Sequence, residues 1–209
     1  MAPEARGRTE AEAGHAYSVS SPTLTLIAGA NGSGKSTLTK WARAYFQRTA
    51  TLDPDAMAVD LQARSSAELS RLEAGRELLR TAEGYLAKGV SFSVETTLSG
   101  NTYLKMLASA KRLAYSTRLF YIGTEDLSIN IARVKARVLA GGHDVPVEDQ
   151  TRRYGRSFEN LPKALVLVDE AVLLDNSLDR GHQVVALKLS GGQIQLFEPV
   201  PRWAEFLRG

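Results

Sequence analysis

An eight-residue motif, GANGSGKS at positions 29–36, constrains the fold of this chain more than any other feature. It fits the pattern GxxxxGKS in full. An apolar, β-branched run, TLTLIA at 23–28, stands directly before it, and apolar residues at helical spacing follow from Lys35 to Phe46. The motif requires this succession of strand, loop and helix. We therefore expect an α/β fold in which the loop joins the first strand to the first helix.

The chemistry of this loop follows from its glycines and from its place at the start of a helix. Glycine lets the backbone bend until several amide hydrogens point at one anion, and the helix N-terminus adds about half a positive charge. Lys35 can then reach the terminal phosphates of a nucleoside triphosphate, and the hydroxyl of Ser36 can ligate Mg²⁺. The sequence thus predicts ATP as cofactor and these phosphate-binding residues: Gly29, Ala30, Asn31, Gly32, Ser33, Gly34, Lys35, Ser36 and Thr37.

Strands and helices alternate beyond this loop. Short apolar runs predict strands at 49–52, 90–94 and 117–122. The predicted helices begin near Pro54, span 66–88 and 101–113, and follow a cap at Thr124. Such alternation implies right-handed crossovers, and hence a P-loop NTPase fold with a mainly parallel sheet and helices on both of its faces.

The composition limits the domain organisation, the chemistry and the partners that the chain can have. The chain has 209 residues, 44% of them hydrophobic and 23% charged, and we expect a mobile tail over residues 1–22 and a single domain over 23–209. It lacks cysteine, which excludes thiol catalysis and cysteine zinc sites. No run of 18 apolar residues and no signal peptide occurs, which predicts a cytoplasmic protein without a membrane partner. The net charge of +3 is too small to indicate nucleic acid as a partner.

Carboxylates follow two of the predicted strands. Asp53 and Asp55 come after the second strand, and Glu95 ends the third, with the hydroxyls of Thr96 and Thr97 beside it. Because the carboxyl ends of parallel strands meet at one edge of a sheet, these side chains should lie close to the phosphate loop. A small-molecule kinase needs a carboxylate to orient or deprotonate the acceptor hydroxyl. The three carboxylates are therefore candidates for chemistry, and the threonines for substrate binding, while Asp53 is equally suited to cap the next helix.

Basic residues gather on both sides of a glycine-containing segment, GGHDVP at 141–146. They are Arg133, Lys135, Arg137, Arg152, Arg153 and Arg156. We interpret residues 133–156 as a basic lid, whose hinge lets arginines close on a transferring phosphoryl group and exclude water. Arg133 and Arg137 share one helix face, whereas Arg152 and Arg153 cannot both point inward. The other interpretation is a pair of solvated helix faces, with His143 either at the substrate or in solvent.

A second nucleotide-related motif, LSGGQ at 189–193, matches the signature of transporter-type ATPases. In those proteins the signature opens a helix and precedes an acidic strand. Here it follows the candidate acidic segment, and alternating residues come after it at 193–197. We therefore interpret it as the turn of a hairpin over 184–197.

The segment LVLVDE at 165–170 resembles the apolar strand and acidic pair of the magnesium site in the same ATPases. Its apolar residues also keep helical spacing, and we expect a helix that ends near Glu170, followed by a short strand over 172–175. Asp169 is then a structural or surface acid. The alternatives are an ATP-driven machine with its metal at Asp169 and Glu170, and a binding module that has lost catalysis.

Several blocks of the sequence together resemble the zeta toxin family of P-loop kinases. In chain order they are IAGANGSGKST (27–37), DPDAMA (53–58), VETTLSG (94–100), RVKARVLAGGHDVP (133–146), RRYGRSFENL (152–161) and LLDNS (173–177). The later blocks are far more specific than the phosphate loop alone, and they are similar to the compact bacterial branch of the family.

The resemblance implies a cytoplasmic kinase that uses ATP and Mg²⁺. It implies phosphorylation of the 3'-hydroxyl on the amino sugar of UDP-N-acetylglucosamine, a precursor of the cell wall, and an antitoxin protein as partner. Related branches phosphorylate other acceptors, including NAD and other nucleotide sugars.

The resemblance also implies roles for residues already singled out. Lys35 and Ser36 match the phosphate and magnesium residues of the family. Asp55 matches its catalytic acid, with Asp53 as the alternative base because the compact branch commonly has asparagine at that position. The remaining matches are Glu95 to the substrate-region glutamate, and Arg137 with Arg152 or Arg153 to the phosphate-sensing arginines.

Overall fold

A computed structural model describes residues 21–46, 49–62 and 67–209 of the chain. Within these ranges, the side chains of Arg43, Asp55, 60–62 and 67–72 lie outside the description. Residues 1–20, which make up most of the predicted tail, also lie outside it, so the predicted division into a tail and one domain stays a prediction.

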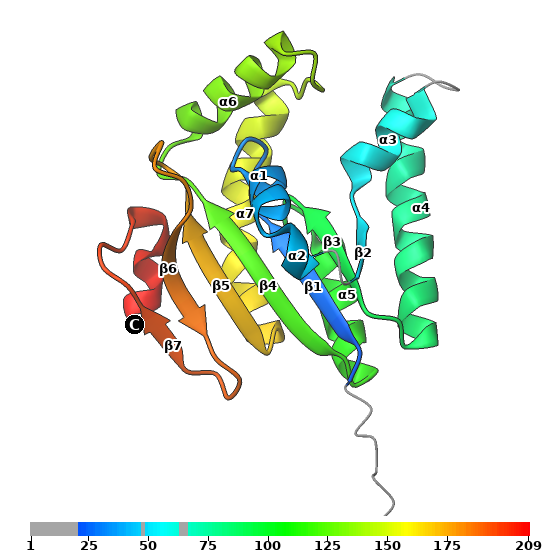
Figure 1. Ribbon diagram of the computed structural model, residues 1–209, viewed down its shortest axis with the longest axis vertical. Coiled ribbons are helices and arrows are strands. Elements are labelled where there is room, and N and C mark those ends of the chain that lie inside the picture. The colour runs from blue at the N-terminus through cyan, green and yellow to red at the C-terminus, as the bar shows by residue number, and fades with distance from the viewer. Residues whose placement is uncertain (1–20, 47–48, 63–66) are drawn as a thin grey trace, which may run out of the picture.

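The described chain alternates strands and helices as the sequence predicts (Figure 1). The strands are β1 (Thr23–Ala28), β2 (Ala50–Leu52), β3 (Phe92–Thr96), β4 (Ser116–Gly123), β5 (Glu170–Asp175), β6 (Gln183–Lys188) and β7 (Ile194–Leu196). The helices are α1 (Lys35–Trp41), α2 (Arg43–Phe46), α3 (Pro54–Gln62), α4 (Ala67–Lys88), α5 (Asn101–Arg112), α6 (Leu127–Leu139), α7 (Val147–Leu167) and the 3-10 helix η1 (Arg202–Arg208).

The strands form one seven-stranded sheet in the order β2-β3-β1-β4-β5-β6-β7. The first five strands in this order pair in parallel, and β6 and β7 add an antiparallel hairpin at one side. Strand β1 lies in the middle, where Leu26 pairs with Val94 on β3 and with Leu119 on β4. A strand in this position is covered on both faces, which explains the uninterrupted apolar run before the phosphate loop.

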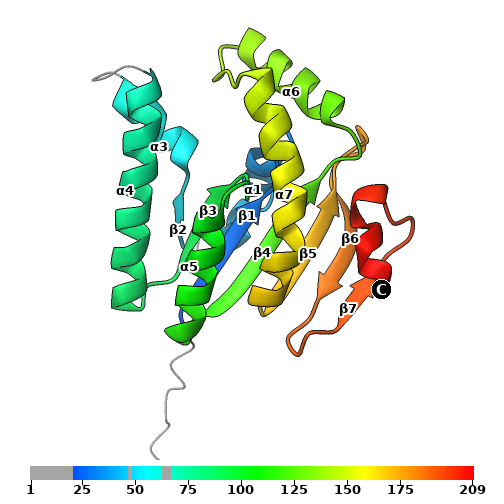
Figure 2. The same ribbon diagram turned by 180° about the vertical axis from the view of Figure 1, so that it is seen from behind.

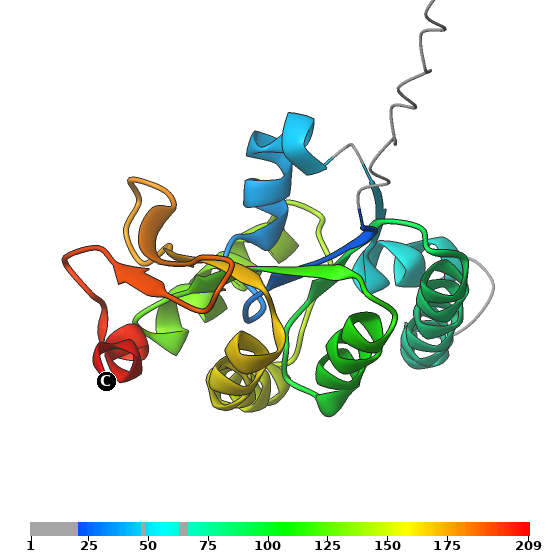
Figure 3. The same ribbon diagram turned by 90° about the horizontal axis from the view of Figure 1, so that it is seen from below.

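Helices cover the two faces of the sheet unequally. Seen from below, α1 and α2 lie on one face, and α4, α5 and α7 lie on the other (Figure 3). The view from behind shows α5 and α7 over the strands, with α4 beside α3 next to β2 (Figure 2). The larger core cluster joins those helices to β1, β3 and β4 through residues such as Leu24, Leu78, Leu107 and Leu161. This is the mainly parallel, two-sided arrangement of a P-loop NTPase, and it confirms the predicted fold class.

All five parallel strands end at the same edge of the sheet. In Figure 1 the arrows of β4 and β5 point toward this edge, where α1 and α6 lie. The phosphate loop follows β1 there, and the ends of β2 and β3 bring Asp53 and Glu95 to it. Thr124 and Asn176 follow β4 and β5. In a parallel sheet, ligand sites ordinarily lie at this edge. They lie where the crossover connections lead to strands on the two sides of one central strand, which here is β1.

Two predicted helix boundaries are wrong. Helix α6 is capped by Asp126 and not by Thr124, because the Asp126 carboxylate accepts a hydrogen bond from Ser128 N at 2.7 Å. Helix α7 ends at Leu167 rather than near Glu170, since Asp169 is bonded to the first residues of β4 and the chain joins the sheet earlier than the periodicity indicates. The predicted hairpin is confirmed: LSGGQ forms the turn between β6 and β7, with Leu189 N donating to Gln193 O at 2.9 Å.

Candidate active site

The phosphate loop has the tight geometry that its motif predicts. Gly32 has a φ angle of +78°, and a Cβ atom there would lie only 2.5 Å from the backbone oxygen of Asn130 on α6. The hydroxyl of Ser33 is buried and has no hydrogen-bond partner in the described part of the chain. Lys35 closes across the loop, with its Nζ donating to Gly29 O at 2.9 Å. A glycine-bound cradle with a buried, unpartnered hydroxyl and an ammonium group suits an anion.

A hydroxyl and a carboxylate meet beside this cradle. Ser36 Oγ, at the start of α1, donates to Glu95 Oε1 at 3.1 Å, and Glu95 is only 9% exposed. Both are hard oxygen donors of the kind that Mg²⁺ prefers. Among the described residues no cluster of three or more His, Cys, Asp or Glu exists, and the contact described here offers two oxygen ligands, Ser36 and Glu95. That is the usual arrangement for Mg²⁺ bound together with substrate phosphates, and Ser36 with Glu95 fits the ion.

A cavity of about 550 Å³ opens between the phosphate loop, α6 and the segment after β5. Its volume lies within the ordinary range for a ligand pocket. Arg133 and Arg137 line it from the basic lid, and Leu178, Asp179 and Gly181 line it from the opposite side. The phosphate-loop residues in its wall are Asn31, Gly32, Gly34, Lys35, Ser36 and Thr37. Of the other predicted cradle residues, Gly29 and Ala30 form the buried start of the loop.

A smaller cavity of about 190 Å³ also borders Lys35. Its lining from the strand ends is Asp53, Pro54, Glu95, Thr96 and Thr97, and the remaining residues are Asn31, Lys35, Tyr103, His143, Val145 and Arg153. Every residue predicted to bind substrate therefore lines this one cavity. Tyr103 was missed, because a tyrosine on a helix has no local signal that separates it from a core residue.

The two cavities share part of their walls. Asn31, Lys35, Asp53 and Glu95 line both of them. Two ligands, one in each cavity, would therefore approach each other across Lys35 and the two carboxylates. An arrangement of this kind can hold a phosphoryl donor and an acceptor on opposite sides of one charged group.

The loop after β3 is held in a conformation that a leucine rarely adopts. Leu98 has a φ angle of +56° and is fully buried. Its amide donates to Thr96 Oγ1 at 2.9 Å, and its carbonyl accepts from Asn160 Nδ2 on α7 at 2.9 Å. A left-handed leucine costs roughly 1–2 kcal/mol, so these bonds and the burial hold it there. The strained turn sets the direction of Thr96 and Thr97 at the smaller cavity.

The basic lid, residues 133–156, consists of the second half of α6, the segment 140–146 and the first half of α7. Arg137 Nη2 donates to His143 O at 2.9 Å, which ties the end of α6 to the segment that follows. Arg153 Nη1 lies 3.4 Å from Asn31 Oδ1 in the phosphate loop. Both arginines pair with Asp149, Arg152 at 2.6 Å and Arg153 at 3.7 Å, but 56% of the Arg152 side chain is exposed and only Arg153 lines the smaller cavity. Of the two adjacent arginines, Arg153 is therefore the one that the structure brings to the site.

Asp53 and Asp55 differ in what the structure describes. Asp53 stands at the end of β2 and lines both cavities. Asp55 belongs to the first turn of α3, and its side chain lies outside the described residues. The choice of catalytic base between them stays a prediction.

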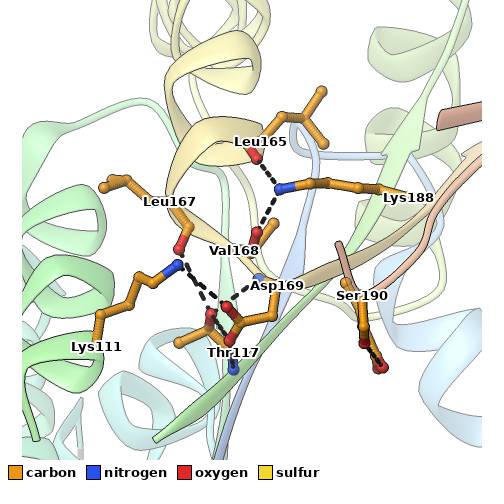
Figure 4. A network of polar contacts seen from close by, with 9 residues as sticks. Lys111, Thr117, Leu165, Leu167, Val168, Asp169, Lys188 and Ser190 are labelled. Atoms are coloured by element: carbon orange, nitrogen blue, oxygen red, sulfur yellow. Dashed lines mark hydrogen bonds and ion pairs between the residues drawn. The ribbon is translucent and has the colours of Figure 1, made fainter. Parts of the chain in front are cut away.

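The acidic pair of LVLVDE lies at the opposite end of the sheet, where it joins a network of polar contacts (Figure 4). Asp169 Oδ2 accepts from Thr117 N and Thr117 Oγ1, both at 2.8 Å, and Asp169 Oδ1 pairs with Lys111 at 3.1 Å. Burial acts to raise the pKa of Asp169, but the bonds from Thr117 and Lys111 outweigh it, and the pKa is lowered. Asp169 is therefore a structural acid, as the periodicity predicts.

The same network includes the end of α7. Lys188 Nζ donates to the carbonyls of Leu165 at 2.7 Å and Val168 at 2.5 Å (Figure 4). Burial lowers the pKa of Lys188, and the nearby charge of Lys111 lowers it further. Glu170 is bonded to Arg118 and to Ser190 of the LSGGQ turn. These contacts tie the LSGGQ turn to the end of the sheet that lies opposite the phosphate loop.

The family of this chain follows from its likeness to known proteins. The model of the Zeta toxin family matches residues 9–183. The chain belongs to the Zeta toxin family. An uncharacterised protein of Haemophilus influenzae is 35% identical over 126 residues, which are 60% of this chain and 88% of that protein. The family and the fold are those of ATP-dependent kinases, the enzyme class that the sequence predicts.

Solved structures with the same fold include a chain from a toxin–antitoxin system. A chain of the AvrRxo1-ORF1:-ORF2 complex with ATP superposes with a TM-score of 0.70 at 16% identity, covering 90% of this chain and 62% of that one. A chain of the PezAT toxin–antitoxin system of Streptococcus pneumoniae gives 0.56 at 19% identity, with 78% and 71% covered. The zeta toxin chain described here thus spans about three fifths of the AvrRxo1 chain that it matches. Within the described ranges, none of its helices has the length and apolarity to cross a bilayer.

Proposed function

We propose that this zeta toxin family member transfers the γ-phosphoryl group of ATP to a sugar hydroxyl of a nucleotide sugar such as UDP-N-acetylglucosamine. One observation carries the proposal: two cavities meet at Asn31, Lys35, Asp53 and Glu95. We assign ATP to the larger cavity, which borders the phosphate loop and has the volume of a nucleotide site. The acceptor sugar then occupies the smaller cavity, whose volume suits a single ring and whose lining is rich in hydroxyl and carboxylate groups.

The reaction needs charge neutralisation more than covalent chemistry. Lys35 lies between the two cavities, where the phosphoryl group would move, and Arg137 and Arg153 border it from the basic lid. Their positive charges oppose the charge that spreads over the phosphoryl oxygens in the transition state. Mg²⁺ bound at Ser36, with Glu95 adjacent, supplies further neutralisation at the phosphates.

The acceptor hydroxyl must lose a proton as the new bond forms. We assign this proton to Asp55, on the resemblance to the family, and the orientation of the acceptor to Asp53. Thr96, Thr97 and His143 offer hydroxyl and ring groups to the rest of the sugar. The breaking bond joins the β,γ-bridging oxygen of ATP to the γ-phosphorus, the acceptor oxygen takes its place, and ADP leaves.

The partner we propose is an antitoxin protein, because the PezAT structure is described as part of a toxin–antitoxin system. A cytoplasmic location and the absence of nucleic acid and membrane partners stay predictions from the sequence.

Transfer itself is tested by incubating the protein with γ-labelled ATP, Mg²⁺ and separate acceptors. The set comprises UDP-N-acetylglucosamine, other UDP-sugars, NAD and free nucleosides. We expect label on the UDP-sugar and none on UDP alone, since UDP has no amino sugar. Label on NAD in preference to every UDP-sugar would make NAD the acceptor. No label on any acceptor would refute the proposed kinase reaction.

The two aspartates are tested by matched variants. Asp55→Asn should reduce transfer by at least about 10²-fold and leave ATP binding intact, because it removes a proton acceptor. Asp53→Asn should chiefly raise the KM of the acceptor. If Asp55→Asn keeps its turnover while Asp53→Asn loses it, Asp53 is the base.

A further inference from the structure

Two carbonyl oxygens of the phosphate loop are held from outside the motif by asparagine side chains. Asn130 Nδ2 on α6 donates to Asn31 O at 2.8 Å, and Asn176 Nδ2 after β5 donates to Ser33 O at 2.7 Å. Both asparagines are buried, with exposures of 0% and 8%. Neither carbonyl takes part in the opening hydrogen bonds of α1, which go to Gly34 O. The two side chains therefore fix peptide groups that the helix leaves free.

Because the peptide bond is planar, each of these contacts also sets the direction of the amide hydrogen in the same peptide group. In a trans peptide the C=O of one residue and the N–H of the next point in opposite directions. Asn176 draws the carbonyl of Ser33 outward, and so directs the amide hydrogen of Gly34 toward the hollow of the loop. Asn130 does the same for the amide of Gly32 through the carbonyl of Asn31. Both peptides contain a glycine, whose backbone can turn over most readily, so these are the peptides that most need to be held.

Asn176 is itself held at both ends of its backbone. Its amide donates to Gly123 O at 3.0 Å, at the end of β4. Its carbonyl accepts from Arg133 Nη1 on the basic lid at 2.7 Å. The side chain also fills the space beside Gly34, where a Cβ atom would lie 2.4 Å from its Nδ2. Asn176 thus links the lid to the phosphate loop through one residue.

We infer that Asn176 and Asn130 are positioning residues that hold the amides of the phosphate loop toward the phosphates of ATP, with Asn176 also coupling the lid to the loop. The inference rests on the proposed function of this site. Neither residue touches the reacting atoms in this account. Each acts through the peptide group that it orients.

His182 provides a matched control, because it contacts another carbonyl of the phosphate loop. Its Nε2 lies 3.2 Å from Gly34 O, a longer contact than those of the two asparagines. That carbonyl, however, also accepts from Thr37 N at 3.1 Å and Leu38 N at 3.0 Å, so α1 fixes it without the histidine. Loss of the His182 side chain should therefore leave the direction of the peptide unchanged.

The experiment measures the Kd of a fluorescent ATP analogue with Mg²⁺ at pH 8, and the thermal unfolding midpoint, for the full chain and three variants. Asn176→Asp keeps the shape of the side chain but has no hydrogen to donate when ionised. Asn176→Ser is shorter and neutral, and it carries the test if the aspartate variant does not fold. We expect both to weaken binding about five- to tenfold, the equivalent of one hydrogen bond near 1 kcal/mol, and His182→Ala to stay within about twofold.

A pH series separates positioning from general damage. A protonated aspartic acid can donate again to Ser33 O, so binding by Asn176→Asp should recover in part relative to the parent protein as the pH falls from 8 to 4, where an aspartate with an ordinary pKa near 3.9 is about half protonated. Asn176→Ser has no group that titrates in this range and should show no such recovery.

Equal binding by the parent and both Asn176 variants would overturn the inference, and so would an equal loss in His182→Ala. A defect in Asn176→Asp that does not change with pH would overturn it as well. If the parent chain does not bind the analogue at all, the proposed kinase fails first and this inference fails with it. Binding of the analogue by the parent without phosphorylation of any acceptor leaves the positioning role standing and refutes only the acceptor assignment.

Discussion

Replacing Asp169 with asparagine distinguishes a structural acid from a magnesium ligand. In a transporter-type ATPase an acid in this sequence context would hold the metal, and its loss would stop ATP turnover. In the structure Asp169 lies instead at the rear of the sheet, bonded to Thr117 and paired with Lys111. The substitution Asp169→Asn should therefore weaken the fold slightly and leave phosphoryl transfer unchanged.

The expected loss of stability follows from the contacts. Asparagine can still accept from Thr117 through its amide oxygen, but the bond loses the strength that the negative charge gives it. The ion pair with Lys111 disappears, although at 39% exposure of the Asp169 side chain it contributes less than about 1 kcal/mol. Together, and after screening by solvent, these losses come to about 1 kcal/mol, or roughly 2–4 °C in the unfolding midpoint of a chain of this size.

The difference in stability between the parent and Asp169→Asn should decrease as the pH falls. The pKa of Asp169 in the folded protein is lowered, because the bonds from Thr117 and Lys111 outweigh burial, which acts to raise it. A carboxyl group whose pKa is lower in the folded state stabilises the fold above its unfolded pKa, near 3.9, and loses this contribution as the pH falls through the folded value. The difference in midpoint between the parent and Asp169→Asn should thus be full at pH 7 and smaller at pH 3.

The assay is thermal unfolding followed by circular dichroism at pH 7, 5 and 3, together with the rate of acceptor phosphorylation at pH 7. Glu83→Gln, which removes an exposed carboxylate from α4, serves as the control and should leave both quantities unchanged. Loss of phosphorylation in a folded Asp169→Asn would refute the reasoning, and so would a midpoint difference that persists unchanged at pH 3.

Three further changes test other parts of the structure. Gly32→Ala should abolish binding of ATP, measured at equilibrium, because the new Cβ would lie 2.5 Å from a backbone oxygen. Gly75→Ala on α4 meets no atom within 4 Å and should raise the stability, measured by denaturant unfolding, by about 0.5–1 kcal/mol. Lys188→Met should lower stability by about 2 kcal/mol, or some 4–8 °C, with an unchanged kcat, because two carbonyls of α7 lose a charged donor. Arg153→Ala should lower kcat by at least about tenfold, while Arg156→Ala, exposed on the same helix, should change it less than twofold; equal effects would remove the special role of Arg153.

The parts of the site that lie within one motif could be predicted, because short-range chemistry dictates them. The glycines of the phosphate loop, Lys35 and Ser36 follow from one octapeptide, and Asp53 and Glu95 follow from the rule that parallel strands end at one edge. The contact between Ser36 and Glu95 joins two such predictions into one pair of oxygen donors, which we propose as the site of Mg²⁺.

The side chains that hold these motifs in place could not be predicted in the same way. Asn160 reaches Leu98 across 62 residues, and Asn176 reaches Ser33 across 143. Each asparagine follows an ordinary helical or strand pattern locally, and its role depends on which carbonyl the folded chain brings to it. The predicted cap of α6 was wrong for a related reason. The hydroxyl of Thr124 donates to Asn130, and Asp126 caps the helix.

The strand order has a consequence for the behaviour of this protein in concentrated solution. A sheet offers unpaired amide and carbonyl groups along its two outer strands, and a long outer strand is a template for pairing with another chain. Here the outer strands are β2 and β7, and each has only three residues. The family match ends at Gln183, where β6 begins, so the last hairpin covers the side of β5 that would otherwise be open. A chain cut before β6 would expose that six-residue strand, and self-association through its edge would follow.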